Sequence, residues 1–205
     1  MRLILAILVA AGLAAPAWGD ATVKQLFSRE NRALGSIPEA QLDVLLQRPT
    51  GAGNVTYSRS FISGLPRASG GTQWRCLAEA LYFEARGESV RGQFAVAEVI
   101  LNRVDSGQFP NSVCGVVKQG TGRKFACQFT YTCDGYKDVI REKAAFTSAG
   151  KIAKLMLEGA PRPLTSGATY YHTKAVRPSW SRKFYRTATI GVHHFYRGKT
   201  RLSQN

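Results

Sequence analysis

Helical periodicity fills the middle of the chain and gives way to strand-like alternation near its end. Apolar residues recur every three or four positions over residues 74–85 and again over 93–104, and residues 137–157 continue this helical spacing. Residues 168–173 and 187–196 instead read as short strands. Helices followed by a small strand region predict an α+β fold, mostly helical with a small C-terminal β portion.

Local signals place the ends of the first two helices. Gly87 is expected to end the helix that starts near Trp74, and Ser89 is expected to cap the next one. The Asp-Ser-Gly run at 105–107 ends that second helix. Residues 187–196 are expected to form one alternating strand, which would point the neighbours His193 and His194 to opposite faces.

The N-terminus has the layout of an export signal. Arg2 precedes an uncharged run over residues 3–15, Pro16 breaks it, and Ala17-Trp18-Gly19 places small residues before a cleavage point. The apolar run is short for a membrane span, which needs about 20 residues. We therefore expect residues 1–19 to be a signal peptide and the mature protein to be periplasmic or secreted, without a lasting membrane span. A retained N-terminal anchor is the alternative.

Composition divides the remainder into two parts. Residues 20–71 are expected to be an N-terminal arm or linker. It would hold a short amphipathic helix after Pro38 and a stretch rich in Gly, Ser and Pro over 49–71. The main domain is expected to cover residues 72–205. Its size suits one domain.

Four cysteines lie close together in the second half of the chain: Cys76, Cys114, Cys127 and Cys133. An even number of cysteines in an exported protein predicts two disulfides, for which three connectivities are open. A zinc cluster is the alternative, but it would favour Cys-x-x-Cys pairs, which the sequence lacks.

Positive charge dominates the chain. It has 28 Lys and Arg against 13 Asp and Glu, and residues 159–205 contain nine basic and no acidic residues. Seven of the 21 aromatic residues lie between positions 168 and 196. A basic surface attracts polyanions, and aromatic faces stack on sugars or bases, so this half suits a polymer-binding groove. Ordinary core aromatics with a solvated basic surface are the alternative.

Glu84 is the candidate general acid. It lies near the end of the first helix, three residues after Leu81 and seven after Leu77, so it can face a partly apolar pocket. Desolvation and the negative end of a helix both raise a carboxyl pKa, which keeps a proton available for a leaving oxygen. A solvated Glu84-Arg86-Glu88 turn is the alternative.

The histidines give no complete metal site. A zinc hydrolase with Glu84 as base would need ligands from His172, His193 and His194, but two of these point to opposite faces and no His-Glu-x-x-His motif occurs. A Ser-His-Asp triad lacks a Gly-x-Ser-x-Gly elbow. We expect no metal and no cofactor.

Ordered sequence blocks resemble the SleB-type cell-wall hydrolases, the spore-cortex-lytic group. The blocks are CLAEALYFEARGESVRGQFAVAEVILNRVDSGQFP at 76–110, CQFTYTCDG at 127–135, GATYYH at 167–172, PSW at 178–180 and IGVHHFYR at 190–197. Together they span most of residues 74–197. The resemblance implies a lysozyme-like, mostly helical fold with a small sheet. It also implies cleavage of the β-1,4 bond between N-acetylmuramic acid and N-acetylglucosamine.

Site residues follow from the same resemblance. The family's essential glutamate, the first of its Glu-Ala-x-Gly-Glu motif, falls on Glu84. Residues expected to bind the substrate are Glu88, Gln128, Tyr170, Tyr171, His172, Trp180 and His194. Departures from the family are the four cysteines, the absence of a separate peptidoglycan-binding repeat and the unmatched residues 20–70, so ordinary wall rather than spore cortex is the expected substrate.

Two chemical routes stay open. In the first, Glu84 acts alone, the substrate's own N-acetyl group assists, and the product is a 1,6-anhydro sugar or, with water, a reducing sugar. In the second, another carboxylate takes part, and the sequence offers Glu88, Glu98 and Asp134.

Three other classes of function compete with a glycan-cleaving enzyme. They are a non-catalytic wall-binding protein, an exported metallo-amidase and a nucleic-acid binder, and the export signal argues against the last. The expected partner is the peptidoglycan glycan strand, and the protein is expected to be a monomer.

Overall fold

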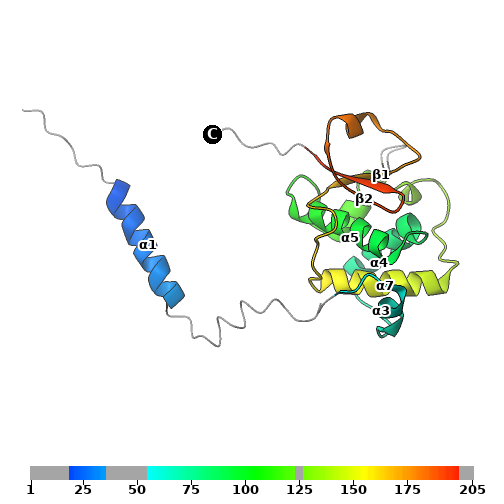
Figure 1. The fold of residues 1–205 in the computed structure, drawn as a ribbon, viewed down its shortest axis with the longest axis horizontal. Coiled ribbons are helices and arrows are strands. Elements are labelled where there is room, and N and C mark those ends of the chain that lie inside the picture. Colours follow the sequence, from blue (N-terminus) through cyan, green and yellow to red (C-terminus); the bar gives the residue numbers. More distant parts are fainter. Residues whose placement is uncertain (1–18, 36–54, 123–126, 199–205) are drawn as a thin grey trace, which may run out of the picture. The chain divides into compact units, whose positions relative to one another are not determined.

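The computed structural model describes residues 19–35, 55–122 and 127–198 (Figure 1). The chain divides into two compact units, residues 1–48 and 49–205. The described part of the first unit is helix α1 (Gly19–Gly35), on which Val23, Leu26 and Phe27 are exposed. Residues 1–18 of the expected signal peptide and the helix after Pro38 lie outside the described residues, and α1 begins at Gly19, its last residue. No described helix is long and apolar enough to cross a membrane.

Three long helices form the body of the second unit: α4 (Thr72–Ala85), α5 (Val90–Asp105) and α7 (Lys143–Leu157), with the short α6 (Val113–Val117) beside them. Their apolar faces meet in one core, in which Leu77, Leu81, Ile100 and Ile152 are completely buried. The predicted cap is confirmed, because the Ser89 hydroxyl accepts a hydrogen bond from the Gly92 amide. The predicted third helix begins later than expected, at Lys143.

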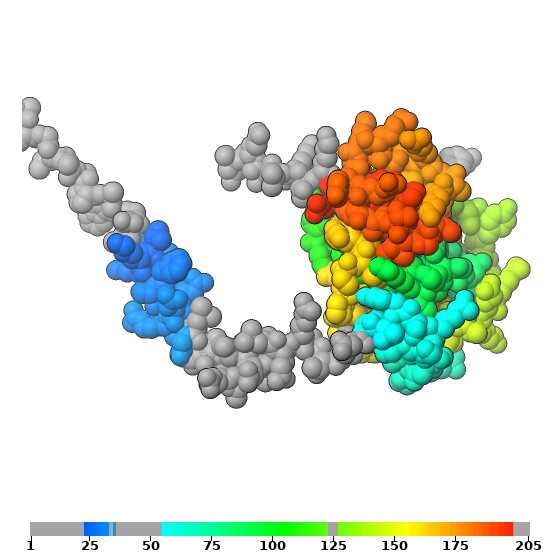
Figure 2. Space-filling model, in the orientation of Figure 1, coloured from blue at the N-terminus to red at the C-terminus, as the bar shows by residue number. Residues whose placement is uncertain are grey.

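The compact unit starts before the expected boundary at residue 72. Helix α3 (Arg59–Gly64) packs on α7, Ile62 is 3% exposed, and the Tyr57 ring lies edge-on to Phe94 with 5.1 Å between centroids. The Lys151 ammonium donates to the Ile62 and Ser63 carbonyls. Residues from 55 onward, cyan in Figure 2, lie directly against the helices. The stretch is rich in Gly, Ser and Pro, but the apolar residues between them pack against the helical core.

A three-stranded antiparallel sheet covers one side of the helices (Figure 1). Its strands are β1 (Tyr170–Thr173), β2 (Tyr185–Ile190) and β3 (His193–Arg197), in the order β1-β3-β2. A 3-10 turn, η3 (Ser179–Arg182), lies between β1 and β2. The expected single strand over 187–196 is wrong: the segment is a hairpin that turns at Gly191, where φ is +58°. Such a positive φ is easily adopted by glycine and breaks the alternation.

The two faces of this sheet have different surroundings. On the inner face, Ile190 and Phe195 pack with Ala168 against Ala95 and Val99 of α5 and form a second small core. His193 is buried on this side, whereas its neighbour His194 is only partly covered, as expected for consecutive strand residues. The outer face carries the cross-strand pair His172 and His194.

Both expected disulfides are present, and the structure selects one of the three connectivities. Cys76–Cys114 joins α4 to α6, and Cys127–Cys133 closes the loop that contains η2 (Thr130–Thr132). Together, the helices and the three-stranded sheet confirm the predicted fold, which is mostly helical with a small C-terminal sheet.

Candidate active site

Glu84 lies in the last turn of α4 with its side chain turned toward the interior. The Tyr171 hydroxyl donates a hydrogen bond to Glu84 Oε2 over 3.3 Å. Burial raises the pKa of the Glu84 carboxyl and is the largest influence; the Tyr171 hydrogen bond and the Arg103 charge act in the opposite direction. Glu84 is therefore a half-buried carboxyl group that holds its proton more firmly than an exposed glutamate, and the solvated-turn alternative does not describe it.

Tyr171 reaches Glu84 from the inner face of β1. Its ring lies edge-on to His193 and beside Phe195. Burial and the nearby Glu84 raise the pKa of Tyr171 well above its ordinary value. Tyr171 therefore stays a neutral phenol and a hydrogen-bond donor over the whole range in which Glu84 titrates.

Arg103 is the functional candidate that the sequence reasoning missed. It is 1% exposed on α5, and its Nε donates to the Thr169 carbonyl over 2.6 Å. The Gln128 amide oxygen accepts from both terminal guanidinium nitrogens at 3.1 and 3.2 Å. Aromatic rings surround the guanidinium, with Phe109 at 5.2 Å and Tyr170 at 5.7 Å from it. Within residues 55–122 and 127–198, no carboxylate forms an ion pair with it.

A signal for Arg103 does exist in the sequence. It falls four residues after Val99 and seven after Val96, both completely buried, so it occupies an apolar-stripe position of α5. A cation at such a position is rarely buried without a specific partner. The positive charge of Arg103 lowers the pKa of Glu84. Within the described segments, no hydrogen bond or ion pair joins the two side chains.

A cavity of about 510 Å³ is linked to Glu84 through Tyr131. Its lining residues come from the 122–138 region: Gly122, Tyr131, Thr132, Cys133, Gly135, Tyr136 and Asp138. Tyr131 stacks on Phe83, the residue before Glu84, with 4.5 Å between ring centroids. Burial raises the pKa of Tyr131, and the charges of Glu79 and Glu84 add to that rise. Glu84 itself does not line the cavity, and Tyr131 connects the two.

The other carboxylates proposed for a two-carboxylate scheme have structural partners. Glu98 is 1% exposed and accepts from the Leu164 amide and from the amide and hydroxyl of Thr165, all within 2.9 Å. Asp134 accepts from the Tyr136 amide at 2.9 Å. These contacts engage both carboxylate oxygens of Glu98 and one oxygen of Asp134 in holding loops in place.

Glu88 holds the β2–β3 hairpin against the helices. Its side chain is 6% exposed, and its Oε1 accepts from the Val192 amide and lies 3.0 Å from His193 Nδ1. Burial lowers the pKa of His193 despite this carboxylate. A Cβ at Gly191 would lie 1.9 Å from Glu88 Oε2, so the hairpin approaches this closely only because Gly191 has no side chain. Glu88 therefore has a structural role in holding the hairpin, and its expected part in substrate binding stays a prediction.

The predicted substrate-binding residues divide into two groups. Tyr171 meets Glu84 on the inner face of the sheet, and Gln128 joins this group through Arg103. His172, Trp180 and His194 belong to the outer face. Tyr170 packs between Phe109 and the Trp180–Phe184 pair near the sheet edge.

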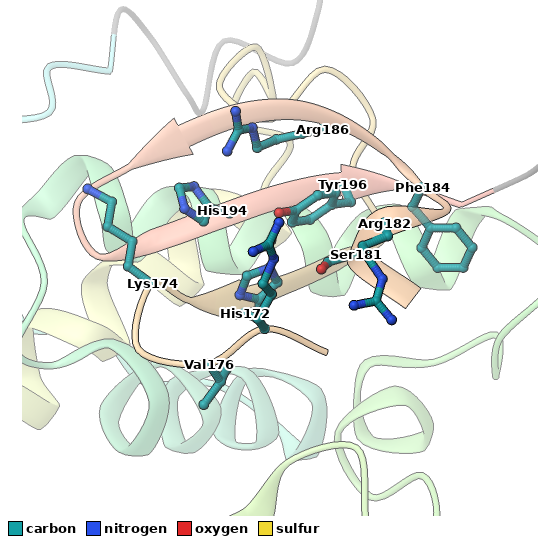
Figure 3. A pocket seen from close by; sticks show the side chains of 10 residues that line it. His172, Lys174, Val176, Ser181, Arg182, Phe184, Arg186, His194 and Tyr196 are labelled. Atoms are coloured by element: carbon teal, nitrogen blue, oxygen red, sulfur yellow. The ribbon is translucent and has the colours of Figure 1, made fainter. Parts of the chain in front are cut away.

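The outer-face group surrounds a second cavity, of about 480 Å³ (Figure 3). His172 Nδ1 lies 2.8 Å from the Thr173 carbonyl, which can only accept, and Nε2 shares a hydrogen bond with the Tyr196 hydroxyl at 3.0 Å. The Trp180 ring stands edge-on to His172 at 5.5 Å. His194 bonds the Thr189 hydroxyl at 2.9 Å. Nowhere in the described segments do three His, Cys, Asp or Glu side chains gather as metal ligands would.

The half-buried Glu84 carboxyl lies on an α+β scaffold, and comparison with known families identifies the class. A family described as Cell Wall Hydrolase matches residues 87–196, which is 110 of the 205 residues. The chain belongs to the cell wall hydrolase family, as the sequence blocks predicted. The match includes the sheet and both Gln128 and Glu88, and it begins three residues after Glu84.

Similar proteins carry related names. The spore cortex-lytic enzyme of Bacillus subtilis (strain 168) is 51% identical over 55 residues, which are 27% of this chain and 18% of that protein. The spore cortex-lytic enzyme of Halalkalibacterium halodurans is 37% identical over 122 residues, 58% of this chain and 33% of that protein. The chain thus matches a third or less of the length of these curated relatives. The solved catalytic domain of the germination-specific lytic transglycosylase SleB from Bacillus anthracis is 31% identical, with a TM-score of 0.47; the match covers 65% of this chain and 100% of that one.

Proposed function

We propose that the protein cuts peptidoglycan glycan strands at the β-1,4 bond between N-acetylmuramic acid and N-acetylglucosamine, with Glu84 as the single general acid and base. The observation that carries the proposal is the half-buried Glu84 carboxyl, whose pKa is raised and whose Oε2 is hydrogen-bonded by Tyr171. Membership of the cell wall hydrolase family and the names of the relatives, spore cortex-lytic enzyme and SleB lytic transglycosylase, support the choice of substrate.

The first step is proton donation to the glycosidic oxygen. A raised pKa leaves a larger fraction of Glu84 protonated near neutral pH, which a general acid requires. Tyr171 occupies Oε2, while Oε1 has no hydrogen-bond partner within the described segments, so Oε1 is the oxygen free to carry the proton to the substrate. Tyr171 thereby fixes the direction of the transfer.

The second step returns the proton. When the glycosidic bond breaks, positive charge develops on the muramic acid ring and its own N-acetyl group meets that charge. Glu84, now a carboxylate, is stabilised by the Tyr171 hydroxyl and by the buried Arg103 charge. It then takes the proton of the ring's 6-hydroxyl, whose oxygen closes a 1,6-anhydro sugar; attack by water would instead give a reducing sugar.

A matched pair of variants tests the role of Glu84. Glu84→Gln should reduce release of soluble fragments from purified sacculi by about 10²- to 10⁴-fold, because a positioned general acid is worth that much. Glu79→Gln is the control: Glu79 is on the same helix and pairs with Arg75 at the surface. Mass analysis of the fragments distinguishes anhydro from reducing ends. Equal release by both variants would refute the assignment of Glu84.

The same assay separates the competing classes. A non-catalytic wall-binding protein would pellet with sacculi and release nothing, and a metallo-amidase would free stem peptides without cutting glycan. We further propose that the protein acts outside the cytoplasm as a monomer. The two disulfides support export, and sedimentation of the purified chain tests its oligomeric state.

A further inference from the structure

The outer-face cavity takes no part in the chemistry proposed for Glu84, yet its lining is unusual. It holds four basic side chains and no carboxylate: Lys174, Arg177, Arg182 and Arg186. Within the ranges that the structure describes, none of the four is in an ion pair. Like charges gathered in a hollow repel one another and focus a positive field, so the arrangement favours an anion.

The floor of the pocket is formed by aromatic rings that are held in place by contacts with one another. The His172 and Tyr196 rings stack at 5.2 Å and share a hydrogen bond, and the Trp180 ring stands edge-on to Tyr196 at 5.4 Å. Figure 3 shows Arg186 coming from β2 and Arg182 from the segment before it, around His172, His194 and Tyr196. Guanidinium groups bind oxyanions through paired N–H donors. The pocket thus combines a rigid floor with basic groups around it.

We propose that this outer-face pocket binds the carboxylates of peptidoglycan stem peptides, as a second site separate from the Glu84 site. The inference rests on the proposed function for its choice of polymer. A glycan strand of N-acetylated sugars whose lactyl groups carry peptides has no charge of its own, so the stems supply the anionic groups of that polymer. Three guanidinium groups and one ammonium match several carboxylates better than one.

The sheet separates this pocket from the catalytic group. Tyr171 and His172 are consecutive in β1, and their side chains leave the strand on opposite faces, one toward Glu84 and one into the pocket. A stem held on the outer face therefore does not occupy the space beside Glu84. The pocket anchors the enzyme on the wall while a glycan bond is cut on the other side of the sheet.

Binding of a free stem peptide tests the site without any cleavage. The probe is a synthetic stem tetrapeptide with its amines acetylated, titrated into the full chain, with the same acetylated peptide amidated at every carboxyl as its neutral counterpart. We expect the amidated peptide to bind at least about 10-fold more weakly, because charge-assisted hydrogen bonds are lost. Binding should also shift the imidazole NMR signals of His172 and His194, which locates the peptide.

Two charge-matched double variants locate the site further. Arg182→Gln with Arg186→Gln removes two cations of the pocket and should weaken tetrapeptide binding by about 10-fold or more. Lys183→Gln with Arg197→Gln removes two exposed cations outside the pocket and should change binding by less than about twofold, the effect of general surface charge.

Several results would overturn the proposal. They are equal binding of the amidated and free peptides, equal loss in the two double variants, and tighter binding of inorganic phosphate or polyphosphate than of the tetrapeptide, which would make the pocket a phosphate site. The proposed function fails separately, since the tetrapeptide has no glycosidic bond: peptide binding without glycan cleavage would contradict Glu84 catalysis and leave the pocket intact.

Discussion

The two faces of the small sheet differ in the charged groups that they contact and in how far those groups are buried. On the inner face, Tyr171 meets a carboxyl whose pKa is raised by burial, with Arg103 enclosed behind it. On the outer face, His172 opens into a pocket of basic side chains that stay in contact with solvent. A strand only a few residues long thus contacts a half-buried carboxyl on one face and an exposed basic pocket on the other, because alternate side chains leave it in opposite directions.

The contact that fixes the inner face to the helices gives the largest expected effect. Gly191→Ala should lower the free energy of unfolding by about 3 kcal/mol, because the new Cβ would clash with the Glu88 carboxylate and φ is +58°. Gly107→Ala is the control: φ there is +66°, but nothing lies within 4 Å of the added Cβ. Urea denaturation measures both, and equal losses would show that the Glu88 contact adds nothing.

Replacement of the buried Arg103 should give the second-largest effect. Arg103→Met should lower the free energy of unfolding by about 2 kcal/mol, because the Thr169 carbonyl and the Gln128 amide lose their donor. It should also move the alkaline fall of the rate to higher pH, since the Arg103 charge lowers the pKa of Glu84 and the reacting form is protonated. Arg103→Lys keeps the charge and should keep the pH profile of wall cleavage. An unchanged profile in Arg103→Met would contradict the coupling to Glu84.

Loss of the phenol that orients Glu84 should have a smaller effect. Tyr171→Phe should slow wall cleavage by about tenfold, the worth of one hydrogen bond to a charged group. Tyr185→Phe removes a hydroxyl from an exposed tyrosine of β2 and should leave the rate unchanged. Turbidity loss of sacculi compares the two; similar rates for both variants would remove Tyr171 from the mechanism.

The smallest expected effect is a gain in stability on removing the acid itself. The folded protein binds the Glu84 proton more tightly than the unfolded chain, so stability is lost as pH rises through the folded-state pKa. Glu84→Gln should therefore raise the free energy of unfolding at pH 7 by up to about 1 kcal/mol, and by less at pH 4. Denaturation at the two pH values measures the difference, and a gain that grows toward acid pH would contradict the raised pKa.

Much of the fold was predictable because it depends on local patterns. The apolar stripes located α4 and α5, and Ser89 marked the start of α5. The hairpin was missed because TATIGVHHFY alternates on both sides of Gly191, and alternation alone does not distinguish one strand from two. The docking of α3 depends on Ile62 meeting a helix about 90 residues later, which no local pattern contains.

The partial burial of Glu84 was predictable from its place beside an apolar stripe, whereas its selection as the acid came from the family resemblance and stays a prediction. The division of the other site residues between two faces was not predictable. The rule that separates His193 from His194 also separates Tyr171 from His172, but only the strand pairing of His172 with His194 brings the outer-face residues together. The roles of Glu88 and Glu98 depend on backbone amides at Val192, Leu164 and Thr165, which are distant in sequence and carry no signal of their own.

The strand order has a consequence for biosynthesis. The last strand to leave the ribosome, β3, is the middle one, and β1 and β2 each pair with it and not with each other. A nascent chain that stops before residue 193 therefore has no sheet, and Tyr171 has no platform from which to reach Glu84. The hydrogen bond between Tyr171 and Glu84 can therefore form only when translation has passed the end of β3 at Arg197.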